Sequence, residues 1–351
     1  MTEQLFLGIT GLIFAALFVW GFRVLPRERW QMLAAIPLHK EEQGQWRALN
    51  LTYYGFLLAG ATAISSLYGL ILLQSTSMYL PGVIAVFLLI FSVSLPAAKI
   101  LARIVEKKLH TFTVGGAFFC GLLFAPWAIV AVNLVLRLAG APELNLLVVL
   151  AALAISYVLG EGLGRLSCVS YGCCYGKPLK ESNWLTRRIF HRFSFVFTGA
   201  TKKVAYDGGL EGEKLLPIQA ITCVLYTATA LFSTHLFLQG RYAAAFLLSL
   251  IVSQVWRFLS ETMRADFRGF GRISVYQKMS LVAVPYAILI AWFVSAAVLP
   301  PPSIILGLSI LTQPLPMIGL QLLWLSIFLI FGRSTATGST VSFHVVKTDQ
   351  P

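Results

Sequence analysis

Nine long apolar stretches constrain the fold of this chain more than any other feature. They cover residues 4–22, 51–74, 79–102, 112–136, 144–168, 216–238, 242–263, 277–299 and 304–331. A helix needs about 20 predominantly apolar residues to cross the roughly 30 Å hydrocarbon core of a bilayer. Inside a bilayer each segment must satisfy its own backbone hydrogen bonds, which favours helices. The sequence therefore predicts an all-α, polytopic helical membrane protein.

The composition and the two ends of the chain agree with this prediction. Charged residues make up 12% of the chain, about half of the 25% that is typical of soluble domains. The first stretch follows Glu3 and lacks both the basic start and the small-residue cleavage site of a secretory signal, so we expect a retained anchor. The last stretch contains Pro314 and Pro316, so we expect it to be broken or partly re-entrant.

Charge sorts the connecting segments into two groups. Basic residues gather in 23–50, 103–108, 170–215 and 264–272, which fall on one side of the predicted bundle. By the positive-inside rule that side is cytoplasmic. The polar segment 170–215 predicts a small head, and the polar tail after Arg333 is expected to be disordered. Because the net charge of +13 is dispersed over membrane-proximal loops, we expect no nucleic-acid partner.

Two sets of ionisable residues lie inside or beside apolar stretches. In SQVWRFLSETMR, Arg257, Glu261 and Arg264 fall on one helical face, and Glu161 and Arg165 are spaced i, i+4. Such groups are costly at membrane depth and usually mark a site or a pairing network. Arginines held by carboxylates suit a phosphate group, which guanidinium binds bidentately. The alternatives are that the pairs only join helices, or that the arginines reach out to lipid headgroups.

The stretch GRLSCVSYGCCYGKP, residues 164–178, combines glycines, an arginine and three cysteines. Gly172 and Gly176 permit tight turns and a close approach to a ligand. The adjacent Cys173 and Cys174 do not easily bridge each other, and no C-x-x-C spacing is present. We therefore expect no metal and no cofactor, with the cysteines acting as small apolar residues.

This stretch resembles the signature of the bacterial prolipoprotein diacylglyceryl transferases, many of which carry G-R-I-G-C-F-x-x-G-C-C-Y-G-K-P. Further similarities follow in family order over residues 50–297. They are Tyr54-Gly55 (the family's R-W-Y-G-L), Gly115-Gly116 (H-G-G-L-x-G), Pro217 and Gln219 (H-P-x-Q), Arg257, Glu261 and Arg264 (R-x-x-x-E-x-x-R), and YQKMS at 276–280 (G-Q-x-L-S).

The resemblance implies a function and a location. The family transfers a diacylglyceryl group from phosphatidylglycerol to the cysteine thiol of a lipoprotein precursor in the bacterial inner membrane. For this chain it implies a multi-pass transferase with phospholipid and a lipoprotein precursor as partners. Arg165 and Arg257 are expected to clamp the phosphate, Glu261 to orient Arg257, and Tyr54 to hydrogen-bond the lipid headgroup. The other residues expected to bind substrate are Gly115, Gly116, Cys168, Gly172, Gly176, Gln219 and Arg264.

The resemblance also implies a division of the chain. Residues 50–299 would form the transferase-like membrane core of seven helices, with the head at 170–215. Residues 1–49 would add an N-terminal transmembrane helix and a basic loop, and residues 300–351 a hydrophobic segment and a polar tail.

Two family histidines are replaced, which leaves alternatives open. Val114 stands before the Gly-Gly pair and Leu216 before Pro217. His110 lies one helical turn before Val114 and is a candidate to take over the catalytic role. The family's motif side faces the periplasm, whereas the positive-inside rule puts it in the cytoplasm. The alternatives are a non-catalytic phospholipid-binding or translocating protein, a transferase with another acceptor, and a thiol-redox protein.

Overall fold

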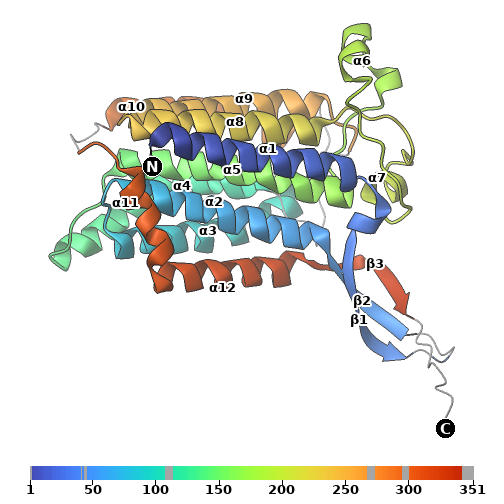
Figure 1. Cartoon of the computed structure of the whole chain (residues 1–351), viewed down its shortest axis with the longest axis horizontal. Helices are drawn as coiled ribbons and strands as arrows, with labels where there is room; N and C mark the ends of the chain where they lie inside the picture. The colour runs from blue at the N-terminus through green and yellow to red at the C-terminus, as the bar shows by residue number, and fades with distance from the viewer. Residues whose placement is uncertain are drawn as a thin grey trace.

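The computed structural model describes residues 2–40, 42, 46–106, 114–266, 273–294 and 300–341. In this part of the chain nine helices are long and apolar enough to span a membrane, and they lie side by side in one bundle (Figure 1). These helices are α1 (Glu3–Val24), α2 (Tyr53–Ser75), α3 (Leu80–Glu106), α4 (Val114–Leu138), α5 (Leu146–Tyr171), α8 (Ile218–Leu238), α9 (Tyr242–Thr262), α10 (Val275–Phe293) and α12 (Pro314–Phe331). The predicted polytopic helical membrane protein is confirmed.

The last apolar stretch is broken, as its prolines predict. A short helix α11 (Ile304–Leu308) continues into the 3-10 helix η3 (Ser309–Thr312), and α12 begins at Pro314. Proline is well tolerated at the first position of a helix, where its missing N–H leaves no bond unmade. The chain therefore turns at this point and then runs along the bundle as α12.

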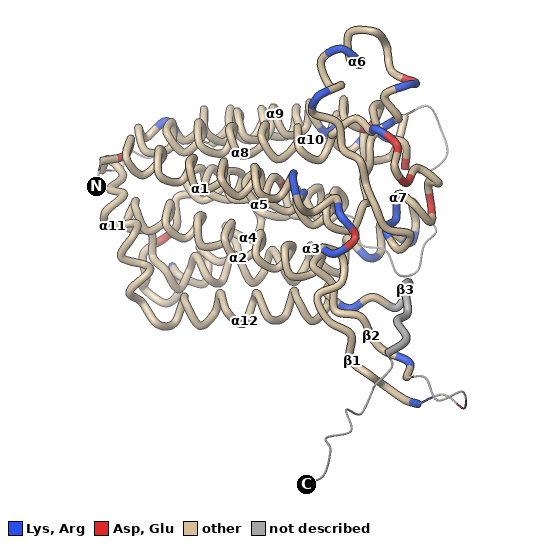
Figure 2. The backbone as a smooth tube through the Cα atoms, turned by 45° about the vertical axis from the view of Figure 1, so that its right-hand side comes forward, with Lys and Arg blue, Asp and Glu red and all other residues tan. Residues whose placement is uncertain are grey.

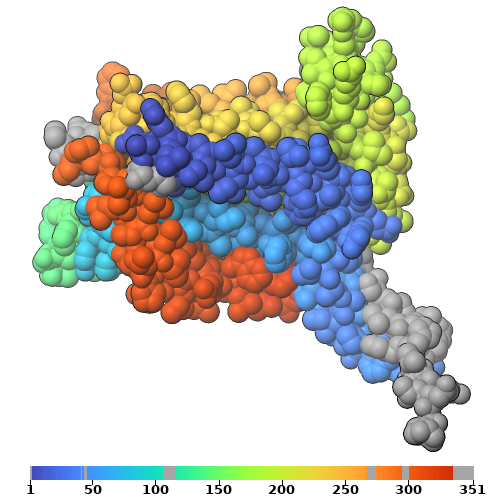
Figure 3. Space-filling model, in the orientation of Figure 1, coloured from blue at the N-terminus to red at the C-terminus, as the bar shows by residue number. Residues whose placement is uncertain are grey.

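Helix α5 is the central element of the bundle. It packs against α2, α8 and α9, and nearly all of its residues from Leu147 to Ser170 are buried. Its start is capped by the side chain of Asn145, which accepts from the Val148 N–H, and it ends at Gly172 in the left-handed region. Helices α1 and α12 lie on one outer face, with α2 visible between them (Figure 3). Any charged residue on α5 is thus held in the interior.

A small β-sheet at one end of the bundle corrects two expectations. The segment expected to be a basic loop contains β1 (Met32–Lys40) and β2 (Trp46–Thr52), and the tail expected to be disordered forms β3 (Arg333–Val341). The strands pair antiparallel in the order β1-β2-β3. The sequence hides them because the inward positions of β2 are small or polar, and because the partners β2 and β3 are far apart in the chain.

Close packing of two glycines joins this sheet to the bundle. The Thr52 hydroxyl donates to the Gly332 carbonyl at 3.0 Å and accepts the Gly55 N–H as the cap of α2. A Cβ on Gly55 would lie 2.0 Å from the Gly332 Cα, so only glycine fits at this crossing of α2 and α12. This contact explains why glycine is required at position 55, next to Tyr54, which is expected to bind the lipid headgroup.

The described basic residues of the basic segments gather at one end of the bundle, as the charge pattern predicts (Figure 2). The same end carries the head, with the short helices α6 (Trp184–Phe190) and α7 (Lys203–Tyr206). Lys202 anchors the head: it is fully buried, and its Nζ donates to the carbonyls of Leu25 and Ser170, at the ends of α1 and α5. These two hydrogen bonds fix this segment to the bundle.

Candidate functional site

Two arginines from different helices share one buried carboxylate. Arg165 Nη2 donates to Glu161 Oε1 at 2.5 Å along α5, and Arg257 Nη1 of α9 lies 3.5 Å from the same oxygen. The hydroxyl of Tyr157, one turn before Glu161, donates to its other oxygen. The Glu161 side chain is only 3% exposed. The expected phosphate-clamp arginines are therefore brought together, with Glu161 as their common partner.

Gly115 makes room for one of these arginines. A Cβ at this position, in the first turn of α4, would lie 1.9 Å from Arg257 Nη2 and 2.5 Å from Cζ. The guanidinium of Arg257 thus occupies the space that the absent side chain leaves. The Gly-Gly pair that the sequence singled out has a defined steric role at Gly115, and Gly116 is buried beside it.

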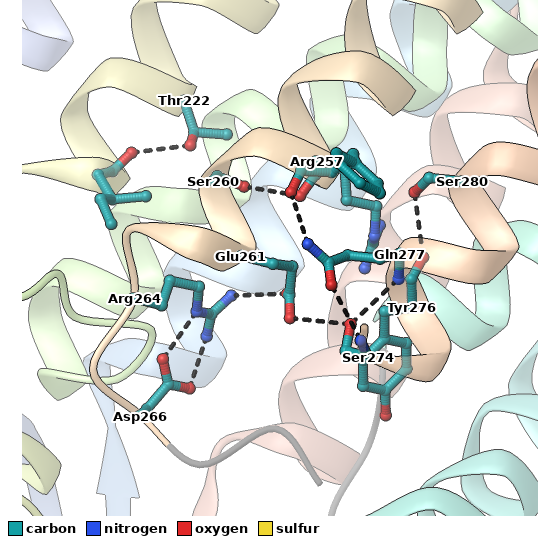
Figure 4. A network of polar contacts seen from close by, with 12 residues as sticks. Thr222, Arg257, Ser260, Glu261, Arg264, Asp266, Ser274, Tyr276, Gln277 and Ser280 are labelled. Carbon is teal, nitrogen blue, oxygen red and sulfur yellow. Dashed lines mark hydrogen bonds and ion pairs between the residues drawn. The ribbon is translucent and has the colours of Figure 1, made fainter. Parts of the chain in front are cut away.

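A second ionic group lies at the end of α9 (Figure 4). Arg264 donates from Nε and Nη2 to the two oxygens of Asp266, both at 2.7 Å, and its Nη1 lies 3.7 Å from Glu261. Glu261 also accepts from the Ser274 hydroxyl at 3.4 Å, and Ser274 forms a capping box with Gln277 at the start of α10. Burial alone would lower the pKa of Arg264, but Cys174, Asp266 and Glu261 raise it above its ordinary value.

This arrangement corrects the role expected for Glu261. The ion pair formed by Arg257 is with Glu161, while Glu261 pairs with Arg264 and links α9 to α10. An i, i+4 spacing allows two side chains to meet but does not require it, since a carboxylate on a neighbouring helix competes for the same guanidinium. Arg264 lines the site, yet its donors already serve two carboxylates.

The loop that follows α5, residues 172–178, is hydrogen-bonded to α8 and to the end of α9. Gly172, at φ 70°, closes α5, and the Cys173 carbonyl accepts from Gln219 Nε2 at 2.9 Å. Further along, Lys177 N–H donates to the Met263 carbonyl, next to Arg264. A Cβ on Gly176 would lie 2.3 Å from the Leu216 carbonyl oxygen, so glycine is required for the loop to pass there. Gly172 and Gly176 therefore allow the backbone of this loop to follow its path.

Two cavities meet at Arg165. The larger has a volume of about 300 Å³ and lies mainly between α2, α3, α4 and α5, and its lining is largely apolar apart from Tyr54, Glu161, Arg165 and a few hydroxyls. The smaller is polar and lies between α5, α8 and α9. Its lining includes Arg165, Cys174, Gln219, Tyr226, Arg257, Glu261 and Arg264. The smaller cavity has a volume of about 10 Å³, room for roughly one water molecule. Arg165 lines both cavities and thus stands between an apolar space and a polar one.

The polar pocket contains hydrogen-bonding atoms that the described residues leave unused. Arg165 Nε is a buried donor with no hydrogen-bond acceptor in this part of the chain, and Arg257 Nη1 makes no hydrogen bond there beyond its 3.5 Å ion-pair contact with Glu161. Burying such a group unsatisfied costs about 1–3 kcal/mol, and more when it is charged. Arg165 and Arg257 carry two positive charges against the single charge of Glu161, so this half of the pocket has one positive charge in excess. The arrangement suits a monoanionic ligand.

The remaining predicted residues are placed as follows. Tyr54 lines the apolar cavity and stacks edge-on against Tyr171 with a centroid distance of 5.7 Å, and Cys168 lines the same cavity. Gln219 lines the polar pocket, and its Oε1 is buried without a hydrogen-bond partner among the described residues. His110 lies outside the described residues. Leu216, at a family histidine position, is 4% exposed in an apolar cluster with Leu179 and Ile218.

Sequence reasoning missed three polar residues of the site. Tyr157 was detectable, because with Glu161 and Arg165 it forms an i, i+4, i+8 series on α5. Asp266 follows Arg264 by two residues, and side chains at that spacing do not face each other on a helix, so the sequence did not predict their pairing. Tyr226, which donates to the Ser253 carbonyl at 2.7 Å, lies in an apolar stretch that gives no polar pattern.

The fold and the site define a polytopic helical membrane protein with a buried, arginine-lined pocket beside an apolar cavity. A search of curated proteins found no match to the chain. The family model described as prolipoprotein diacylglyceryl transferase matches residues 45–293, and the chain therefore belongs to this family.

Proposed function

We propose that this protein transfers a diacylglyceryl group from phosphatidylglycerol to the cysteine thiol of a lipoprotein precursor in the bacterial inner membrane. The observation that carries the proposal is a pair of buried arginine donors beside the apolar cavity. Arg165 Nε has no acceptor among the described residues, and Arg257 Nη1 has only its 3.5 Å ion-pair contact with Glu161 there. A phosphodiester has the charge and the acceptor oxygens that these donors require. The acyl chains would start in the apolar cavity, and the glycerol headgroup would lie toward Tyr54.

The reaction is a displacement at carbon. The acceptor thiolate attacks the diacylglyceryl carbon that bears the phosphate ester, a C–S bond forms, and the C–O bond to phosphate breaks. Glycerol phosphate leaves with one more negative charge than the phosphodiester had. Arg165 and Arg257 would stabilise that developing charge, because preorganised donors in a dry site act most strongly where charge appears.

The acceptor thiol must lose its proton before the attack. An ordinary thiol has a pKa of about 8.5. Leu216 stands in an apolar cluster where the family has a histidine, so no base acts from that position. We therefore expect the thiol to ionise into solvent and the transfer rate to rise with pH toward the pKa of the acceptor, about 8.5.

The test uses the purified full chain in phosphatidylglycerol micelles with a peptide that carries a lipoprotein-type cysteine. Mass spectrometry should detect the diacylglyceryl adduct, and Arg165→Ala and Arg257→Ala should each abolish it. Arg137→Ala is the matched control, because Arg137 is 70% exposed and pairs with Glu143 at the other end of the bundle. Absence of the adduct with folded wild-type protein would refute the proposal.

A second candidate function is phospholipid binding without transfer to a lipoprotein cysteine. The replacement of both family histidines, by Val114 and Leu216, favours it, because neither side chain can act as a base. In that case lipid would remain bound through Arg165 and Arg257 while no adduct forms. Quantifying copurified phosphatidylglycerol in the wild type, Arg165→Ala and Arg137→Ala distinguishes the two functions.

A further inference from the structure

Three cysteines meet at the end of α5. The sulfur atoms of Cys168, Cys173 and Cys174 all lie within 4.8 Å of one another. The sequence gives no hint of this, because the spacing C-x4-C-C matches no usual metal motif. The cluster borders the arginine site, since Cys174 lines the polar pocket with Arg165 and Arg264.

The helix end explains how two of the sulfurs meet. The Gly172 N–H donates to the Val169 carbonyl at 3.3 Å, and the Cys173 N–H donates to the Cys168 carbonyl at 3.0 Å. This is the Schellman pattern, in which the two residues corresponding to Cys168 and Cys173 commonly touch. A contact between these two side chains is therefore what any such helix end produces.

The third sulfur needs a separate explanation. Cys174 has a φ of 56°, in the left-handed region that non-glycine residues rarely adopt. Such a conformation costs on the order of 1–3 kcal/mol and is found mostly where it serves a function. Here the left-handed turn directs a third thiol back to the first two, which a merely apolar helix end does not require.

We propose that Cys168, Cys173 and Cys174 form a binding site for one thiophilic metal ion of the Zn²⁺ or Cu⁺ class. Thiolate ligands select these ions. With metal–sulfur bonds of about 2.3 Å, three sulfurs around one ion lie roughly 4 Å apart, a spacing that the observed cluster already approaches. Cys168 is buried, while Cys173 and Cys174 are half-buried, so an ion would approach from the side of Cys173 and Cys174.

The metal would compete with the lipid phosphate, a consequence that rests on the proposed function. Three thiolates with a divalent ion carry one net negative charge, and with a monovalent ion two. Arg165 and Arg264 face that charge across the same pocket. Metal binding would therefore offset the positive charge that attracts phosphate, and the loaded protein should bind phosphatidylglycerol more weakly.

The binding test uses Cd²⁺ as the probe and needs neither lipid nor peptide, so failure of the proposed function would leave it unaffected. The reduced, full-length protein should bind one equivalent of Cd²⁺, seen as sulfur-to-metal charge-transfer absorption. Cys168→Ser and Cys174→Ser should each remove most of that absorption. Cys120→Ser and Cys223→Ser are the matched controls and should retain it, because these cysteines are outside the cluster.

A second measurement uses the wild-type protein alone, so that a misfolded variant does not decide the outcome. Bound Cd²⁺ should protect three thiols from alkylation, and mass spectrometry of peptides should identify them as Cys168, Cys173 and Cys174. Equal alkylation with and without Cd²⁺ would overturn the proposal. So would a disulfide between two of the three, seen as the loss of two hydrogens, in protein that then binds no Cd²⁺.

Discussion

A single methyl group at Gly115 should separate activity from stability. In Gly115→Ala the new Cβ would lie 1.9 Å from Arg257 Nη2, whereas ordinary contacts begin near 3.4 Å, so the guanidinium must shift by about 1.5 Å. A misplacement of about 1 Å at a catalytic group can cost about 100-fold in rate. That loss corresponds to roughly 2.7 kcal/mol of transition-state stabilisation. We therefore expect transfer to the peptide to fall about 100-fold.

The free energy of unfolding should fall by less than about 3 kcal/mol, because overpacking costs about 1–3 kcal/mol and the helix preference of alanine over glycine offsets about 0.5–1 kcal/mol of it. The assay compares initial rates of adduct formation, by mass spectrometry, with the thermal unfolding temperature in detergent. Gly60→Ala is the matched control, since a Cβ there meets nothing within 4 Å and should leave the rate unchanged. A folded Gly115→Ala variant with a rate within about threefold of wild type would refute the proposed role of Arg257.

Three further variants test the ionic groups. Glu161→Gln leaves two buried arginines without their shared carboxylate and should lower the free energy of unfolding by about 3–5 kcal/mol. Thermal unfolding measures this loss, and added phosphatidylglycerol should restore part of it. Arg264→Lys loses the bidentate bond to Asp266 and should lower the unfolding temperature while leaving the KM for lipid unchanged, because the donors of Arg264 already serve carboxylates. Burial lowers the pKa of Lys202 to about 8, so the unfolded state binds more protons than the folded state between pH 8 and about 10.5. The free energy of unfolding should therefore rise by about 3 kcal/mol as the pH increases through that window. The rise should vanish in Lys202→Met.

The helical core was predictable because one physical signal dominates it. Apolar stretches of membrane-spanning length specify helices whatever their neighbours are, so all nine positions and the break at Pro314 followed from the sequence. The sheet was not predictable in the same way. Strand β2 has Ala48, Asn50 and Thr52 on its inward side, and its partner β3 lies at the other end of the chain. Neither strand carries an alternating apolar pattern.

The sequence singled out the buried ionisable residues but did not specify how they pair. The ionisable groups at membrane depth stood out, and Arg165 and Arg257 do meet. The partner of Arg257 was wrong, because spacing along one helix says nothing about a carboxylate that another helix brings closer. The cysteine cluster escaped prediction for a similar reason. It depends on the backbone angle of Cys174, a property that no spacing rule encodes.

The distribution of charge in the site matters more than its sum. With all six groups ionised, the three arginines and the three carboxylates cancel, which makes their burial tolerable without a ligand. The cancellation is uneven, since Glu161 serves two arginines while Arg264 is held by two carboxylates. The half beside the apolar cavity thus carries the charge that matches a monoanionic phosphodiester. In the proposed transfer, the second charge that develops on glycerol phosphate would have no full counter-ion there, so Arg165 Nε and Arg257 Nη1 would stabilise it. Such a site would favour the transition state without retaining the dianionic product.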